Sequence, residues 1–170
     1  MNVYLIRHAE AALKEIDPER NLTEQGVRDA QRLAEILAPL DLRVETVWYS
    51  PKPHASQTAA AVASSIAPPG AASVRDGLLS FDPVKPIARL LNRADSDIAI
   101  VGHEPFLGRL AARLVCRRAS RPLVELDKPS ALCLRRDVEG AWRIAWLISP
   151  QVVVQSGAEG PAPLSSENFG

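Results

Sequence analysis

The sequence predicts an α/β fold in which helices cover both faces of a mixed, mostly parallel sheet. Short apolar runs at residues 3–6, 44–49 and 98–101 alternate with segments of helical period, which is typical of parallel strands joined by helices. Two later apolar runs, at 131–135 and 142–148, flank a four-residue turn sequence, Asp137-Val138-Glu139-Gly140. This second pattern predicts an antiparallel hairpin, and adding it to parallel strands makes the sheet mixed.

Four helices are expected along the chain. The first follows Thr23, a typical N-cap residue, and ends before Pro39; its apolar face is formed by Val27, Ala30, Leu33, Ala34 and Leu37. The second follows Pro53 and ends before the Pro-Pro-Gly turn at 68–70. The third spans about 84–91 and the fourth about 105–115, each with a proline near its start, where the missing N–H costs little.

The composition fits one globular domain. Among the 170 residues, 46% are hydrophobic and 24% are charged, which are ordinary globular proportions and disfavour a fibrous or wholly disordered chain. We expect the domain to span residues 1–155. The remaining segment, 156–170, is rich in small and polar residues and is expected to form a flexible tail.

Charge and cysteine content exclude several classes of protein. Twenty Lys and Arg residues balance twenty Asp and Glu residues, so no overall field attracts nucleic acid or an anionic membrane. Cys116 and Cys133 are too few for a disulfide framework or a closed thiolate zinc site. The first apolar run is too short for a signal peptide, and no run is long enough to span a membrane. We therefore expect a cytoplasmic protein that binds anions only locally.

Two of the predicted strands are followed by the same kind of residue. Arg7 and His8 follow the first apolar run, and His103 follows the third after one glycine. The carboxyl ends of parallel strands meet at one edge of a sheet, where ligands bind in open α/β folds, so these side chains are expected to meet. His54, the third and last histidine, lies a few residues beyond the remaining strand. A single histidine at a strand end is usually structural, but this joint pattern favours a functional site.

These residue types suit phosphoryl chemistry. An arginine presents a planar fork of donors to phosphate, and a neutral imidazole is a nucleophile for phosphorus. Zinc is the competing hypothesis, since three histidines can form an open catalytic site. Against it, Arg7 places a permanent cation beside His8, and no HExxH or HxH spacing brings two imidazoles onto one element. We therefore expect no metal.

The same residues carry a resemblance to a known family. MNVYLIRHAEA resembles the RHG/RHA signature of the histidine phosphatase superfamily, which has a three-layer phosphoglycerate-mutase-like fold. Ala9 and Glu10 make this segment most similar to the SixA-type phosphohistidine phosphatases. Further stretches agree in order: NLTEQGVRDAQRLAEIL, WYSPKPHASQTAAAVA, IAIVGHEPFLGRLAARLV and WLISP. The resemblance covers roughly residues 2–150.

The resemblance implies a role for each matching residue. His8 matches the nucleophile that becomes phosphorylated, Arg7 the adjacent phosphate-binding arginine, and His103 the second histidine on the phosphoryl oxygens. Arg20 resembles an additional phosphate-binding arginine of the SixA-type branch. His54 is a departure, because it stands where the SPxxRAxQTA element has its phosphate-binding arginine. Losing that guanidinium would weaken phosphate stabilisation by about 1.5–3 kcal/mol unless Arg20, Lys52 or a protonated His54 compensates.

The resemblance also bears on the leaving group. Asp76 and Asp82 are candidates for a general acid, although turn and capping roles are more typical of carboxylates in such positions. A phosphoramidate such as phosphohistidine needs less acid assistance than an alcohol ester, so the weak acid signal is compatible with a SixA-type activity. The compact loops predict a shallow, open site.

Together, these features predict a phosphatase that forms a covalent intermediate on His8, and protein phosphohistidine is its expected substrate. No metal or organic cofactor is expected. The alternatives are a phosphomonoesterase for a small sugar or nucleotide phosphate, and a non-catalytic phosphate-binding module, which the replacement at His54 permits. The expected partner is a phosphorylated protein or small molecule, not nucleic acid or a membrane.

Overall fold

A six-stranded sheet forms the centre of the computed structural model, which describes residues 1–118 and 121–150. In chain order its strands are β1 (Asn2–Arg7), β2 (Thr46–Tyr49), β3 (Ala72–Val74), β4 (Ile98–Gly102), β5 (Ser130–Arg136) and β6 (Trp142–Ile148). Their spatial order is β3-β2-β4-β1-β5-β6. The first four strands in this order are parallel, β5 is antiparallel to β1, and β6 is antiparallel to β5. The predicted mixed, mostly parallel α/β sheet is confirmed.

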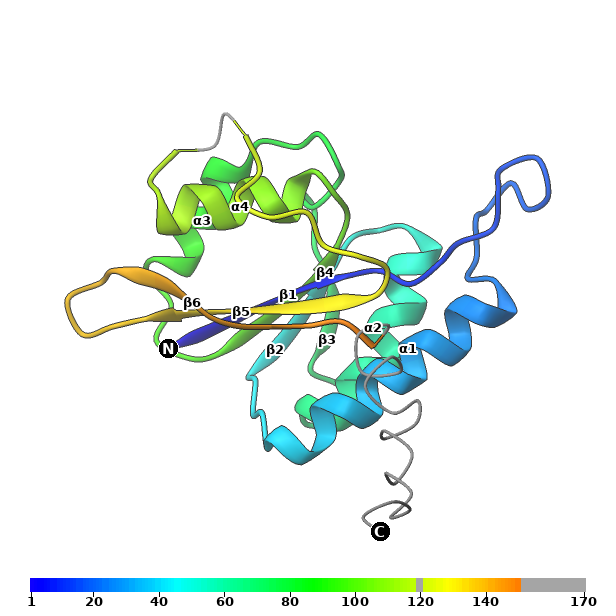
Figure 1. The fold of residues 1–170 in the computed structure, drawn as a ribbon, viewed down its shortest axis with the longest axis horizontal. Coiled ribbons are helices and arrows are strands. Elements are labelled where there is room, and N and C mark those ends of the chain that lie inside the picture. The colour runs from blue at the N-terminus through cyan, green and yellow to red at the C-terminus, as the bar shows by residue number, and fades with distance from the viewer. Residues whose placement is uncertain (119–120, 151–170) are drawn as a thin grey trace, which may run out of the picture.

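Helices cover both faces of the sheet, as predicted (Figure 1). On one face, α1 (Glu24–Leu37) and α2 (Pro53–Ile66) pack through Leu33, Leu37 and Val62 against residues of β1, β2 and β4. On the other face, α3 (Val84–Leu91) and α4 (Phe106–Val115) enclose a core in which Phe106 is fully buried. Two buried clusters separated by the sheet therefore form the three layers.

The start of α1 confirms one sequence prediction and corrects another. Thr23 is the N-cap, and its side-chain oxygen accepts a hydrogen bond from the Gly26 N–H. Val27 was predicted on the buried face, but its side chain is exposed. The buried position of this first turn is Gly26, where a Cβ atom would lie only 2.1 Å from the carbonyl oxygen of Glu10. The helix thus enters too close to the backbone after β1 for a side chain to fit.

Other boundaries agree closely with the sequence. The α3 bounds match the predicted 84–91, and the hairpin turn lies between β5 and β6. β3 was not among the predicted apolar runs, because it has three residues and two of them are exposed. The predicted tail at 156–170 and the last five residues of the predicted domain lie outside the described residues. None of the helices in the described ranges is long and apolar enough to cross a membrane.

The register of the sheet brings distant residues to one edge. Arg7 at the end of β1 pairs with Gly102 at the end of β4, and Tyr49 at the end of β2 pairs with Val101. β5 runs in the opposite direction, so its first residue, Ser130, pairs with Arg7. The segments after β1, β2 and β4 and the segment before β5 therefore meet at this edge.

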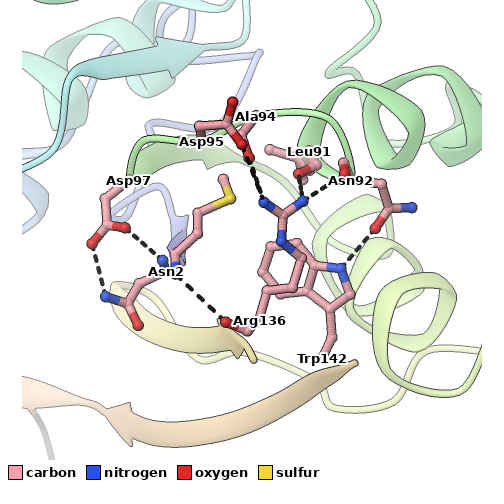
Figure 2. A network of polar contacts seen from close by, with 9 residues as sticks. Asn2, Leu91, Asn92, Ala94, Asp95, Asp97, Arg136 and Trp142 are labelled. Atoms are coloured by element: carbon pink, nitrogen blue, oxygen red, sulfur yellow. Dashed lines mark hydrogen bonds and ion pairs between the residues drawn. The ribbon is translucent and has the colours of Figure 1, made fainter. Parts of the chain in front are cut away.

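The opposite end of the sheet carries a separate polar network, shown in Figure 2. Arg136 donates hydrogen bonds to the backbone carbonyls of Leu91, Asn92 and Ala94 at the C-terminal end of α3. Beside it, the indole N–H of Trp142 donates to Asn92 Oδ1 at 2.7 Å. A cation that binds the last carbonyls of a helix satisfies their hydrogen-bonding capacity and complements the helix dipole. This network ties β5 and β6 to α3.

Candidate active site

Three imidazoles meet at the carboxyl edge of the parallel strands. The ring centroids of His8 and His54 are 4.3 Å apart, those of His8 and His103 are 5.0 Å apart, and those of His54 and His103 are 5.2 Å apart. All three side chains are buried, with 4–6% of their surface exposed. His8 and His103 come directly after β1 and β4, whereas His54 lies in the first turn of α2. The predicted meeting of His8 and His103 is present, and His54 joins them.

His8 is held with one ring nitrogen directed at the backbone. Its Nδ1 is 2.6 Å from the carbonyl oxygen of Ala9, so Nδ1 carries the proton and donates it to that oxygen. In this tautomer Nε2 has a lone pair. Burial lowers the pKa of His8 to about 3, and the neighbouring His54 and His103 act in the same direction. The imidazole is therefore neutral at pH 7, the form in which it is a nucleophile.

His103 is positioned by the end of β2. Its Nε2 lies 2.6 Å from the hydroxyl oxygen of the buried Ser50, the residue after β2. Burial lowers the pKa of His103 to about 4. The hydroxyl fixes the plane of the ring, which leaves Nδ1 as the second polar atom available to a ligand.

His54 is anchored by the loop that precedes α1. Its Nδ1 donates to the carbonyl oxygen of Arg20 at 2.8 Å, which leaves a lone pair on Nε2. Arg20 has a left-handed backbone, with φ of 58°, in the segment that approaches α2. Burial lowers the pKa of His54, so this ring is also neutral near pH 7. Compensation by a protonated His54, one option left open by the sequence, has no support in this environment.

The histidines open into a cavity of about 710 Å³ that is lined by more cations than anions. Its basic residues are Arg7, Lys14, Arg20, Lys52 and Lys128, and its acidic residues are Glu19, Asp82 and Glu104. Arg7 donates from Nη1 to the carbonyl of Leu126, but its buried Nε has no hydrogen-bond partner among the described residues. A buried donor without a partner is unfavourable, and an anion in the cavity would supply one. The five predicted site residues, Arg7, His8, Arg20, His54 and His103, therefore share one cavity that suits an anion.

The carboxylates near the cavity are engaged by the backbone. Glu104 Oε1 accepts from the Leu126 N–H and Oε2 accepts from the Gly108 N–H, each at 3.2 Å. Asp82 Oδ2 accepts from the Leu79 N–H at 2.8 Å and so closes a turn. Burial raises the pKa of Glu104, while these amides favour its charged form. Asp76, the other candidate acid, is not among the residues that line the cavity.

Sequence reasoning missed Lys128 and Lys14. Lys128 lies two residues before β5, and burial together with the nearby Arg7 and Arg20 lowers its pKa. A topological signal was available, because an antiparallel neighbour of β1 must begin where β1 ends, next to Arg7. Lys14 lies in the loop after β1, where no sequence pattern indicates the direction of a side chain.

Comparison with known proteins bears on this site. The family sequence model of the histidine phosphatase superfamily (branch 1) matches residues 3–78. No curated protein matches the chain. Among solved structures, the protein histidine phosphatase SixA complexed with tungstate is 24% identical, with a TM-score of 0.78, covering 90% of this chain and 99% of that one. The resemblance to the histidine phosphatase superfamily is therefore confirmed.

Other structures with this fold differ in their named activities. A putative phosphohistidine phosphatase SixA from Agrobacterium tumefaciens is 21% identical, with a TM-score of 0.68, covering 88% of this chain and 97% of that one. A phosphoserine phosphatase mutant from Entamoeba histolytica, in complex with phosphoserine, is 15% identical, with a TM-score of 0.66, covering 88% and 98%. At these identities the likeness establishes the fold alone. The match to the histidine phosphatase superfamily supports a phosphatase, and its span includes Arg7, His8, Arg20 and His54 but ends before His103.

Proposed function

We propose that this protein is a phosphatase that hydrolyses protein phosphohistidine through a covalent phosphohistidine intermediate on His8. The observation that carries the proposal is the state of His8: a buried, neutral imidazole with its proton held by the Ala9 carbonyl and its Nε2 lone pair among cationic side chains. A nucleophile needs an available lone pair, and a transferring phosphoryl group needs fixed positive donors around its oxygens.

The reaction has two displacements at phosphorus. His8 Nε2 attacks in line, the bond from phosphorus to the substrate nitrogen breaks, and the leaving imidazole takes a proton from water. Water then attacks the phosphorus of phosphorylated His8, which releases inorganic phosphate and returns the neutral ring. In both steps Arg7, Arg20 and His103 hold the equatorial oxygens, and the unpaired Nε of Arg7 is the donor best placed to gain a partner.

The substrate class follows from the leaving group. Glu104 accepts two backbone N–H groups, and Asp82 accepts one, so the fold already engages both carboxylates, while burial favours the protonated form of Glu104. The nitrogen of a phosphoramidate leaves with less assistance. The cavity is also lined mainly by charged and polar side chains, which suits a phosphorylated side chain of a protein. The named activity of the SixA structures is consistent with this choice, and the phosphoserine phosphatase neighbours keep a monoesterase as the alternative.

A second candidate function is a phosphate-binding module without turnover. One observation favours it: His54, a neutral ring, stands where the family has a cationic arginine. Less positive charge around the phosphoryl group would slow its transfer more than it would weaken binding, because charge is redistributed in the transition state.

The test uses a peptide carrying phosphohistidine as substrate and a chelator in every sample. We expect release of phosphate and an acid-labile phosphate on the protein that mass spectrometry places on His8. His8→Ala is expected to lose at least about 10³-fold in turnover, since no other group supplies the nucleophile. Label that persists in His8→Ala contradicts the assignment. Phosphate that binds the wild-type protein without any turnover supports the module instead.

A further inference from the structure

We propose that His8, His54 and His103 form a binding site for one transition-metal ion, with Zn²⁺ as the expected species, in the same cavity as the phosphoryl site. One ligand atom from each histidine lies within 4.8 Å of the other two, and all three side chains are buried. Three imidazoles are a common ligand set for catalytic zinc, which keeps a fourth position for a water or an anion. These are the only histidines of the chain.

The hydrogen bonds around the rings match those of metal-binding histidines. A ligating imidazole usually donates its remote N–H to a carbonyl or carboxylate, which fixes the tautomer and aims the other nitrogen at the metal. Here His8 Nδ1 donates to Ala9 and His54 Nδ1 donates to Arg20, so both Nε2 atoms have lone pairs. The hydroxyl of Ser50 holds the His103 ring through a hydrogen bond at Nε2, and Nδ1 is the other ring nitrogen.

The spacing requires only side-chain adjustment. Zinc binds imidazole nitrogen at about 2.0–2.1 Å, so tetrahedral ligand atoms lie about 3.3 Å apart. The present upper separation of 4.8 Å closes to that value through modest rotations of side chains that already share one cavity. Because the three rings come from separate elements, the absence of an HxH or HExxH spacing in the sequence does not argue against this site.

The positive charge around the three histidines determines which fourth ligand the metal needs. Five basic residues line the cavity, so a bare divalent ion is disfavoured there. Binding becomes favourable when hydroxide or phosphate occupies the fourth coordination position of the metal, because Arg7 and Lys128 then face a negatively charged ligand. The metal site requires histidine at position 54, because the arginine that the histidine phosphatase superfamily has there would replace one ligand with a permanent cation.

Metal binding has a consequence that rests on the proposed function. The Nε2 lone pair of His8 cannot bind zinc and attack phosphorus at the same time. Zinc is therefore expected to inhibit turnover, and removal of zinc by a chelator is expected to restore it.

The test uses Co²⁺ alone, followed by displacement with Zn²⁺, on the full chain produced without a polyhistidine tag. All measurements are made in the Cys116→Ser variant, because Cys116 is an exposed free thiol and cysteine thiolates are metal ligands. We expect one Co²⁺ per chain with the intense visible absorption of four-coordinate cobalt, and loss of that absorption when Zn²⁺ is added. Absence of this spectrum in the presence of excess Co²⁺ overturns the proposal.

Two variants link the spectrum to the three rings. His54→Gln is expected to weaken Co²⁺ binding by at least about 100-fold, because it removes a ligand. Ser50→Ala removes only the hydrogen bond to His103 and is expected to weaken binding by about 10-fold, so it serves if His54→Gln fails to fold. Unchanged affinity in a folded variant contradicts the site. Turnover in chelator is measured separately, so a phosphatase that binds no cobalt refutes this inference and leaves the proposed function standing.

Discussion

At one end of the sheet the guanidinium of Arg136 donates to three backbone carbonyls, whereas at the other end His8 and His54 each bond a carbonyl through only one of two ring nitrogens. The Arg136 end borders the larger cavity, about 990 Å³ against about 710 Å³. Size therefore does not distinguish the two ends. What distinguishes them is whether the polar atoms are satisfied by the protein itself.

This difference separates a structural cluster from a reactive one. In the Arg136 network the donors of Arg136 and Trp142 end on atoms of α3 and the segment after it, as Figure 2 shows. In the histidine cluster, His8 and His54 use only Nδ1 to bond the backbone, and the buried Nε of Arg7 has no hydrogen-bond partner among the described residues. An unsatisfied buried donor such as Arg7 Nε is unfavourable for folding, and a bound ligand removes the penalty. The first end should respond to mutation in stability, and the second in activity.

The largest gain in activity is expected from an arginine at position 54, where the histidine phosphatase superfamily has one. His54→Arg places a guanidinium beside His8, and a charge-assisted bidentate contact to phosphate is worth about 1.5–3 kcal/mol. Turnover of a phosphohistidine peptide is therefore expected to rise by about 10–100-fold, measured by steady-state kinetics in chelator. His54→Gln is the control, since it removes the ring without adding charge. If arginine brings no gain, the cavity has been rebuilt for another ligand.

The next effect tests the structural end. Arg136→Met keeps the apolar stem but leaves three carbonyls without their charged donor, so unfolding in urea is expected to show a loss of about 2 kcal/mol. Arg143→Met is the matched control, because Arg143 is exposed and makes one ion pair with Asp137; its loss should not exceed about 0.5 kcal/mol. Turnover should be the same in both variants. A strong loss of activity in folded Arg136→Met would show that the two ends are coupled.

The sequence predicts the meeting of His8 and His103, but it does not predict the depth of His54 or the exposure of Val27, and each difference has a physical reason. His8 and His103 were predicted together because parallel register alone places strand ends at one edge. The depth of His54 was not predicted, since it depends on how the Arg20 loop folds over α2. Val27 was assigned to the wrong face because helical period says nothing of the close approach of the Glu10 backbone to Gly26. Tertiary contacts of loops thus determine which side chains are buried at these positions, and local sequence patterns do not contain that information.

A further expected effect concerns the pH dependence of stability. In the folded protein the pKa values of His8 and His103 are about 3 and 4, and that of His54 is also lowered, against 6.5 when unfolded. Below pH 6.5 the unfolded chain therefore binds more protons than the folded protein. The stability that these histidines contribute is complete above pH 6.5, and it falls as the pH decreases towards 4. Each histidine contributes a slope of up to about 1.4 kcal/mol per pH unit.

This slope also distinguishes the two ends of the sheet. Urea unfolding between pH 7 and 5, with chelator present, should show it before most carboxylates titrate. His54→Gln should give a shallower slope, because one buried titrating ring is lost, whereas Arg136→Met should keep the slope of the wild-type protein. A stability that stays constant over this range would mean that the rings protonate freely in the folded state.

The smallest effect is expected at Asp82, and it decides between the two classes of substrate. In Asp82→Asn the amide oxygen still accepts from the Leu79 N–H, so the turn is kept while the acid is removed. Turnover of a phosphohistidine peptide should change by less than about twofold, since general acid catalysis is worth 10²–10⁴-fold only where a poor leaving group needs it. A phosphoserine peptide supplies that poor leaving group and is measured in parallel. If the variant loses about 100-fold on phosphoserine, Asp82 protonates an alkoxide and the protein is a phosphomonoesterase. Equal, small changes on both substrates leave phosphohistidine as the substrate that this site handles without an acid.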